Sequence, residues 1–106
     1  MYKICVYVPE NSVENVKLAM FNAGAGRIGN YGSCCWQTDG IGQFLPLAGS
    51  NPTVGTADEL KHVYEIKIEM VCTDALIKPA ILALKASHPY EEPAYDVWKL
   101  EDFSQI

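Results

Sequence analysis

The sequence predicts one α+β domain of β-α-β-β-α-β order, with an antiparallel sheet, two helices on one sheet face and an extra hairpin in the middle. Three observations carry this prediction. Apolar and polar residues alternate over 2–8 and 62–72, which is the pattern of strands with one buried face. Apolar residues recur at helical spacing over 13–23 and 76–84. An Asp-Gly pair at 39–40 lies between two strand-like segments and predicts a hairpin turn.

The first two elements are a strand over 2–8 and the helix that follows it. Asn11 and Glu14 have the spacing of a capping box and predict the helix start, and Gly24 predicts its end. The residues that follow, 24–33, are rich in glycine. A phosphate-binding loop lies between a strand and a helix, whereas these glycines follow a helix, so we interpret them as a tight connection.

The middle of the chain predicts three strand segments. Residues 33–38 and 41–47 form the two arms of the predicted hairpin, joined by Asp39-Gly40. Residues 48–57 contain glycine, proline and asparagine and are interpreted as a loop. The third segment is a long strand over 62–72, in which apolar and polar residues alternate.

The last part of the chain predicts a second helix and a final strand. Asp74 can cap this helix, and Pro79 removes one backbone hydrogen bond, so we expect a distorted first turn. The His88-Pro89 pair ends the helix, and a strand over 94–100 follows.

Two split β-α-β units in this order form a ferredoxin-like sandwich, whose sheet has one face without helices. We expect Tyr7, Trp36, Tyr64 and Trp98 to supply large side chains from these strands. An uncovered apolar sheet face on so small a domain needs a partner, so the sequence predicts a homo-oligomer.

Length and charge exclude several classes of function. The 106 residues fit one domain, spanning 1–106, that can build one core. Eight basic against thirteen acidic side chains give a net charge of −5, so no basic patch is available for nucleic acid or an anionic membrane. No segment is apolar over the length of a membrane span or a signal peptide, so we expect a cytoplasmic protein with reduced cysteines.

The motifs of the chain resemble one protein family over nearly its whole length. Residues 88–97 read HPYEEPAYDV, which resembles the signature of the Nif-three-like (YqfO-type) proteins. The other segments similar to this family are 26–31, 42–47, 51–52 and 55. In those larger proteins the region is an inserted domain similar to the trimeric PII and CutA proteins, and CutA carries a related motif at the same junction. The resemblance implies a PII/CutA-like fold and a trimer.

The resemblance also bears on catalysis. Full-length Nif-three-like proteins hold a two-metal site in the two halves that flank this insertion, and those halves are not in this sequence. We therefore expect the chain to be no enzyme and to lack the hydrolase or cyclohydrolase activity attached to the family. A small hydrolase stays a residual alternative.

The candidate metal ligands are His62, His88, Cys34 and Cys35. The resemblance to CutA implies a role with divalent copper or zinc, but no pair has the spacing of a common metal motif. Adjacent cysteines in a strand point to opposite faces, which disfavours a shared ion. The other two cysteines, at positions 5 and 72, are interpreted as small buried apolar residues.

The candidate ligand-binding residues are His88, Tyr90, Glu91 and Glu92, in the corner between the second helix and the last strand. Two interpretations remain open. In one, the flanking prolines shape a rigid corner, the tyrosine packs and a glutamate accepts backbone amides. In the other, the corner lines a pocket at a subunit boundary and binds a cation or a small polar ligand.

Two further features are candidates for binding. Trp36 and Phe44, on the two arms of the predicted hairpin, could form a stacking platform or simply pack across strands. In PII-like trimers the loop between the middle strands meets effectors, and the equivalent here is 47–56. That loop has no basic residues for nucleotide phosphates, and Arg27 is the nearest cation, so we do not expect ATP binding.

The leading hypothesis is a non-enzymatic PII/CutA-like sensor or interaction module without a cofactor, whose partner is a second copy of itself in a trimer. A small ligand or a protein partner would bind near the His88 corner and the loop after Leu47. The alternative is a CutA-like protein that binds divalent copper or zinc.

Overall fold

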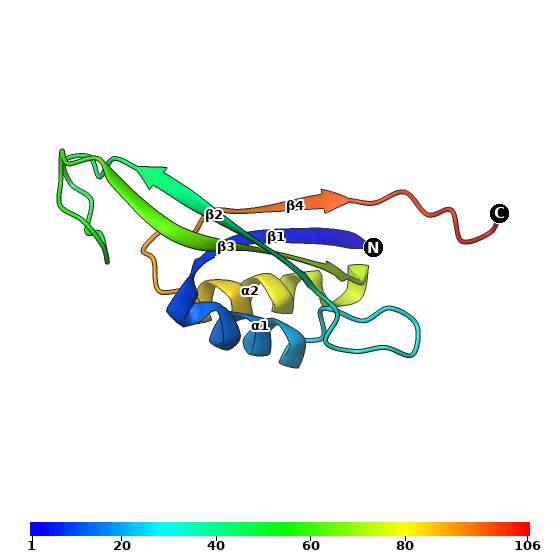
Figure 1. Ribbon diagram of the computed structural model, residues 1–106. Helices are drawn as coiled ribbons and strands as arrows, with labels where there is room; N and C mark the ends of the chain where they lie inside the picture. The colour runs from blue at the N-terminus through cyan, green and yellow to red at the C-terminus, as the bar shows by residue number, and fades with distance from the viewer.

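The computed structural model describes residues 1–106 as a four-stranded antiparallel sheet of order β2-β3-β1-β4, with two helices on one face (Figure 1). The strands are β1 (Tyr2–Pro9), β2 (Trp36–Phe44), β3 (Lys61–Cys72) and β4 (Tyr95–Lys99). The helices are α1 (Val13–Asn22) and α2 (Ile77–Ser87), preceded by the 3₁₀ turns η1 (Glu10–Ser12) and η2 (Asp74–Leu76). This arrangement confirms the ferredoxin-like βαββαβ fold. None of the helices combines the length and the apolar character that crossing a bilayer requires.

The core lies between the sheet and the two helices. Alternate residues of β1 and β3 point toward the helices, because side chains in a strand alternate between faces. Ile4, Val6 and Val8 of β1 meet Ile68 and Met70 of β3 in this layer, all at most 2% exposed. The alternation seen in the sequence therefore predicts correctly which face of these two strands is buried.

Both helices begin with a 3₁₀ turn instead of the side-chain cap that the sequence predicts. Neither Asn11 nor Asp74 makes a capping hydrogen bond, and Asp74 forms an ion pair with Lys99. Pro79 is the third residue of α2, within the first turn, where backbone N–H groups have no partner inside the helix. Proline is therefore tolerated at this position.

The prediction of an extra hairpin in the middle of the chain is wrong, because Asp39 and Gly40 lie inside β2. Their Cα partners on β3 are Ile66 and Glu65. A two-residue hairpin turn of the Asp-Gly type needs positive φ at both residues, and neither has it. The twelve residues of β3 provide an unbroken partner for all nine of β2, so the backbone continues as a strand.

The end of the β2–β3 ribbon extends beyond the rest of the sheet as a two-stranded arm (Figure 1). Residues 61–64 of β3 pair with residues 41–44 of β2 and with no residue of β1. Tyr64 lies in this arm, on the same face of β3 as the core residue Ile66. Tyr7 lies on the opposite face, which has no helices, so the two tyrosines do not share a surface. The arm and its loop position the site described next.

Candidate functional site

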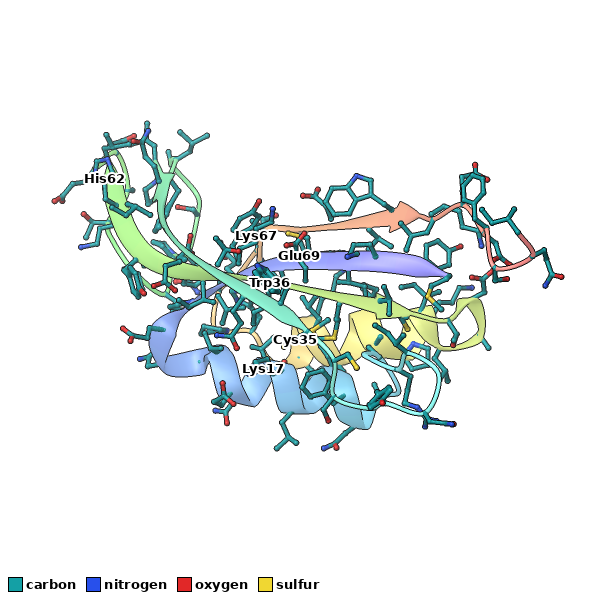
Figure 2. All side chains as sticks on the ribbon, turned by 45° about the vertical axis from the view of Figure 1, so that its right-hand side comes forward. Lys17, Cys35, Trp36, His62, Lys67 and Glu69 are labelled. Atoms are coloured by element: carbon teal, nitrogen blue, oxygen red, sulfur yellow. The ribbon has the colours of Figure 1, made fainter.

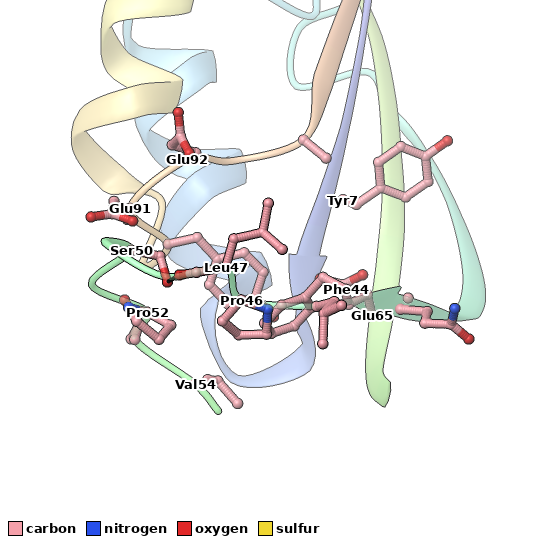
Figure 3. Close-up of a pocket in the computed structure, with 16 residues that line it drawn as sticks. Tyr7, Phe44, Pro46, Leu47, Ser50, Pro52, Val54, Glu65, Glu91 and Glu92 are labelled. Atoms are coloured by element: carbon pink, nitrogen blue, oxygen red, sulfur yellow. Dashed lines mark hydrogen bonds between the residues drawn. The ribbon is translucent and has the colours of Figure 1, made fainter. Parts of the chain in front are cut away.

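A cavity lies where the arm meets the corner after α2. This cavity of about 520 Å³ is lined by sixteen residues, which come from four places in the chain. Tyr7 comes from β1, Glu65 comes from β3, residues 42–54 come from the end of β2 and its loop, and residues 90–94 come from the corner (Figure 3). The structure thus brings together, within one chain, the loop and the corner that the sequence singles out.

Two hydrogen bonds hold the loop against the corner. The backbone N–H of Asn51 donates to Oε1 of Glu91 over 3.2 Å. The hydroxyl of Thr53 donates to the carbonyl oxygen of Pro89 over 2.7 Å. Both contacts join residues that are far apart in the sequence, so they close the loop over the cavity rather than shape a local turn.

His88 belongs to the scaffold of the corner and does not line the cavity. Its side chain is buried, and its ring lies between two backbone groups. Nδ1 accepts the N–H of Tyr90 at 3.1 Å, so the proton is on Nε2, which donates to the carbonyl oxygen of Tyr7 at 2.7 Å. The neutral ring satisfies both groups, and burial lowers its pKa below the usual 6.5.

Tyr90 lines the cavity next to the ring of Phe44. Their ring centroids are 6.3 Å apart, with an angle of 51° between the ring planes. The Tyr90 hydroxyl is buried and has no hydrogen-bond partner of acceptable geometry. Burial first, and then the nearby carboxylate of Glu65, raise the pKa of Tyr90 to about 12, so this hydroxyl keeps its proton.

The carboxylate of Glu65 lies over Gly42 on the neighbouring strand. A Cβ atom at Gly42 would lie 1.8 Å from Oε1 of Glu65, so only glycine leaves room for this side-chain position. Neither residue appears among the candidates predicted from the sequence, because strand pairing between distant segments decides that they meet. A Gly-x-Gly pattern at 40–42 inside a strand was the available signal.

The cavity is apolar in its middle and acidic at its edges. Figure 3 shows Phe44 and Leu47 in the middle, with Glu91 and Glu92 on the connection after α2 and Glu65 beyond Phe44. The lining includes three glutamates and no lysine, arginine or histidine. Of the four predicted ligand-binding residues, Tyr90, Glu91 and Glu92 line the cavity, and His88 supports them from behind.

The predicted metal ligands are not brought together. His62 lies in the arm, where Nε2 is 2.9 Å from Oε1 of Gln43, and Cys35 lies before β2 at the other end of the ribbon (Figure 2). Cys34 precedes Cys35, and His88 is occupied by backbone groups. No three His, Cys, Asp or Glu side chains in the chain form a metal-binding group.

The remaining predicted features lie apart from the cavity or only partly in it. Trp36 and Phe44 are the first and last residues of the same strand, so they form no stacking platform. Trp36 lies on the helix-free face beside Glu69 and Lys67 (Figure 2). Cys5 and Cys72 are buried, as predicted, and burial raises the pKa of both thiols.

Curated relatives match nearly the whole chain. It is 52% identical over 100 residues to a protein of Listeria monocytogenes, 46% identical over 99 residues to one of Bacillus subtilis and 41% identical over 98 residues to one of Mycobacterium tuberculosis. Each is a "GTP cyclohydrolase 1 type 2 homolog". The matches cover 92–93% of this chain, which spans only about a quarter (26–27%) of those relatives. No family model matches the chain.

Solved structures show the same relationship. A Bacillus cereus protein related to NIF3 superposes with a TM-score of 0.82 at 39% identity, over 95% of this chain and 26% of that one. CutA from Xylella fastidiosa gives 0.68 at 18% identity, covering 95% and 84% of the two chains. The PII-like protein CutA from Nostoc gives 0.70 at 14% identity, covering 100% and 86%, which is a likeness of fold. The chain is therefore homologous to a segment of about 100 residues in the NIF3-related GTP cyclohydrolase 1 type 2 homologs, and it has the CutA/PII-like fold.

Proposed function

We propose that this chain is a non-enzymatic binding module that assembles with copies of itself through the helix-free face of its sheet, in the trimer implied by the PII and CutA resemblance. The observation that carries this proposal is the composition of that face. Trp36 at one edge is 69% exposed, and Trp98 at the other edge is 48% exposed. Large exposed aromatic side chains on an uncovered sheet are typical of a protein interface.

The charges between the two tryptophans fit a surface that pairs with itself. Strand pairing aligns Trp36, Glu69, Cys5 and Asp96 in one row across this face. The neighbouring rows hold Lys67 and Lys3, so that both signs of charge alternate over a short distance. A second copy can place its lysines against these carboxylates, whereas a face of one sign would repel its own copy.

The arm supports the same proposal. It extends beyond the helices, and the long axis of the molecule measures 51 Å against 25 and 24 Å for the others. Ile41 of the arm is 76% exposed, and β2 is an edge strand with unpaired backbone groups. An exposed apolar edge favours pairing with another chain, so a neighbouring copy can cover it.

The chemistry of the cavity supports a role in binding rather than in catalysis. Its lining contains no cysteine or histidine, and its half-buried Tyr90 has a pKa raised to about 12, far from that of a neutral-pH acid or base. The name of the relatives refers to GTP, whose phosphates need cationic partners, and the cavity has none. The proposal therefore includes neither a catalytic residue nor a cofactor.

Size-exclusion chromatography with light scattering tests the assembly. We expect the wild-type chain to elute as an oligomer at micromolar concentration and Trp36→Lys to shift it to the monomer. The matched control is Leu82→Lys, because Leu82 is 68% exposed but lies on α2, away from the open face. A monomeric wild type, or equal effects of the two variants, would contradict the proposal.

A further inference from the structure

We propose that the cavity between the arm and the corner binds a small organic cation, an ammonium or amidinium group attached to an apolar body. This inference extends the proposed role in binding by naming a ligand class. It does not depend on self-association, because all sixteen lining residues come from one chain.

The apolar part of the cavity fits the body of such a ligand. Its volume of about 520 Å³ lies within the range of small-molecule sites, about 300–1,000 Å³. Phe44, Leu47, Pro52 and Val54 line it, and the loop that carries three of them is hydrogen-bonded to the corner. The apolar side chains thus form a wall that exists before a ligand arrives.

The charges of the lining favour a ligand of positive charge. Glu65, Glu91 and Glu92 all line the cavity, and none of them forms an ion pair within the chain. The lysine nearest to Glu65 in sequence, Lys67, pairs with Glu69 at 3.9 Å. An anion would meet three carboxylates with no cation beside them, whereas a cation would neutralise part of this charge.

The buried polar and aromatic groups point to the same ligand. The buried Tyr90 hydroxyl lies near the Glu65 carboxylate but forms no hydrogen bond of good geometry, which is unfavourable for a buried polar group. An ammonium N–H can donate to that hydroxyl oxygen and to the Glu65 carboxylate near it. The rings of Tyr7, Phe44 and Tyr90 in the lining offer faces that attract a cation.

Gly42 links this site to the backbone of β2. The Glu65 carboxylate occupies the space where a Cβ at residue 42 would stand, 1.8 Å from Oε1. Gly40, two residues earlier on the same strand and the same face, has nothing within 4 Å of an added Cβ. The two glycines therefore provide a matched pair of variants, since Gly42→Ala moves the carboxylate and Gly40→Ala does not.

Three isosteric probes test the ligand class by NMR titration of the backbone amides. We expect 2-phenylethylamine to bind with shifts at residues 42–54 and 90–94, and at least about tenfold more tightly than neutral 2-phenylethanol. Phenylacetate should not bind. Equal binding of the three probes, preference for the anion, or no binding of the amine at millimolar concentration would overturn the proposal.

Variants locate the binding in this cavity. Glu65→Gln should weaken binding of 2-phenylethylamine about tenfold, Gly42→Ala should weaken it as well, and Gly40→Ala should leave it within twofold of wild type. Full affinity in Glu65→Gln would overturn the assignment.

Trp36→Lys should keep wild-type affinity even if it is monomeric, so failure of self-association and failure of this site are separate outcomes. Loss of binding in that variant would overturn the placement within one chain.

Discussion

At the scale of single residues, His88 shows how one residue of a motif can support the others that line a cavity. Its neutral ring joins the carbonyl of Tyr7 on β1 to the N–H of Tyr90 in the corner. The ring of Tyr90 also packs 4.9 Å from that of His88, between centroids. As the first interpretation of the corner predicts, Tyr90 packs and Glu91 accepts a backbone amide. Binding of a ligand by Tyr90, Glu91 and Glu92, which line the cavity, stays a proposal.

The buried histidine makes the free energy of unfolding depend on pH. Burial lowers the folded-state pKa of His88 below the 6.5 of the unfolded chain. As pH falls below about 6.5, the unfolded state binds the proton first, so stability declines until the folded-state pKa is reached. Urea unfolding between pH 7.5 and 5 should show this decline, and His88→Gln should reduce its slope.

The control for this prediction is His62→Gln. His62 is exposed in the arm, and its ring is within hydrogen-bond distance of the Gln43 side chain, at 2.9 Å. That variant should keep the wild-type slope. His88→Gln should also be less stable at pH 7.5 by about 1–3 kcal/mol, since it leaves buried backbone groups without good partners. An unchanged slope in His88→Gln would show that another group titrates.

At the scale of elements, β2 is where a local signal and strand pairing disagree. Asp-Gly favours a turn because both residues tolerate positive φ. The long strand β3 offers a partner residue to every position from Trp36 to Phe44, and this pairing keeps Asp39 and Gly40 extended. The turn preference of two residues is thus weaker than the strand pairing of all nine residues of β2 with β3.

Gly40→Val distinguishes a strand from a turn at this position. Gly40 does not have positive φ, and an added Cβ meets nothing within 4 Å. A β-branched residue should therefore leave stability unchanged or raise it by up to about 1 kcal/mol, measured by urea unfolding. A loss of more than about 2 kcal/mol would indicate the turn instead.

Gly26, in the connection between α1 and β2, should behave in the opposite way. Its φ is +79°, and a Cβ there would lie 2.7 Å from the ring of Phe21 and 2.9 Å from the carbonyl oxygen of Cys34. Gly26→Ala should lower the free energy of unfolding by at least about 2 kcal/mol. Gly29→Ala is the control, with φ +57° but open space, and should lower it by about 1 kcal/mol. Equal losses would contradict the close packing at Gly26.

At the scale of the whole molecule, the two faces of the sheet differ. Its covered face forms the core with α1 and α2, and its open face is the one through which we propose self-assembly (Figure 1). The cavity lies at the junction of arm, loop and corner, apart from Trp36 at the other end of β2. Tyr7 and Glu65 of the lining share the open face with Trp36, so the two proposed roles are separated by position along β2 and not by sheet face.

Association predicts a melting temperature that depends on protein concentration. A folded state that assembles is stabilised by mass action, whereas a monomer is not. The Tm of the wild type, measured by calorimetry, should rise as the protein concentration is raised from micromolar to millimolar. The Tm of Trp36→Lys should stay constant. Parallel behaviour of the two proteins would contradict assembly through this face.

How much of this protein could be predicted from its sequence depends on the range of the interactions involved. Alternation along β1 and β3 identified the buried faces, and helical spacing identified α1 and α2, since both patterns arise from local backbone geometry. The corner motif indicated Tyr90, Glu91 and Glu92. The sequence missed Tyr7, Gly42 and Glu65, because nothing local marks residues that meet only after the strands pair.

The sequence by itself thus determined the fold class, the positions of β1, β3, β4 and both helices, and the chemistry of the corner. Only the tertiary structure decided that β2 is one strand, that His88 faces inward and that the loop closes on the corner. The reason is that these features depend on hydrogen bonds between distant segments, such as Thr53 to Pro89 and His88 to Tyr7. Periodicity reports which way a side chain points, and packing decides what it meets.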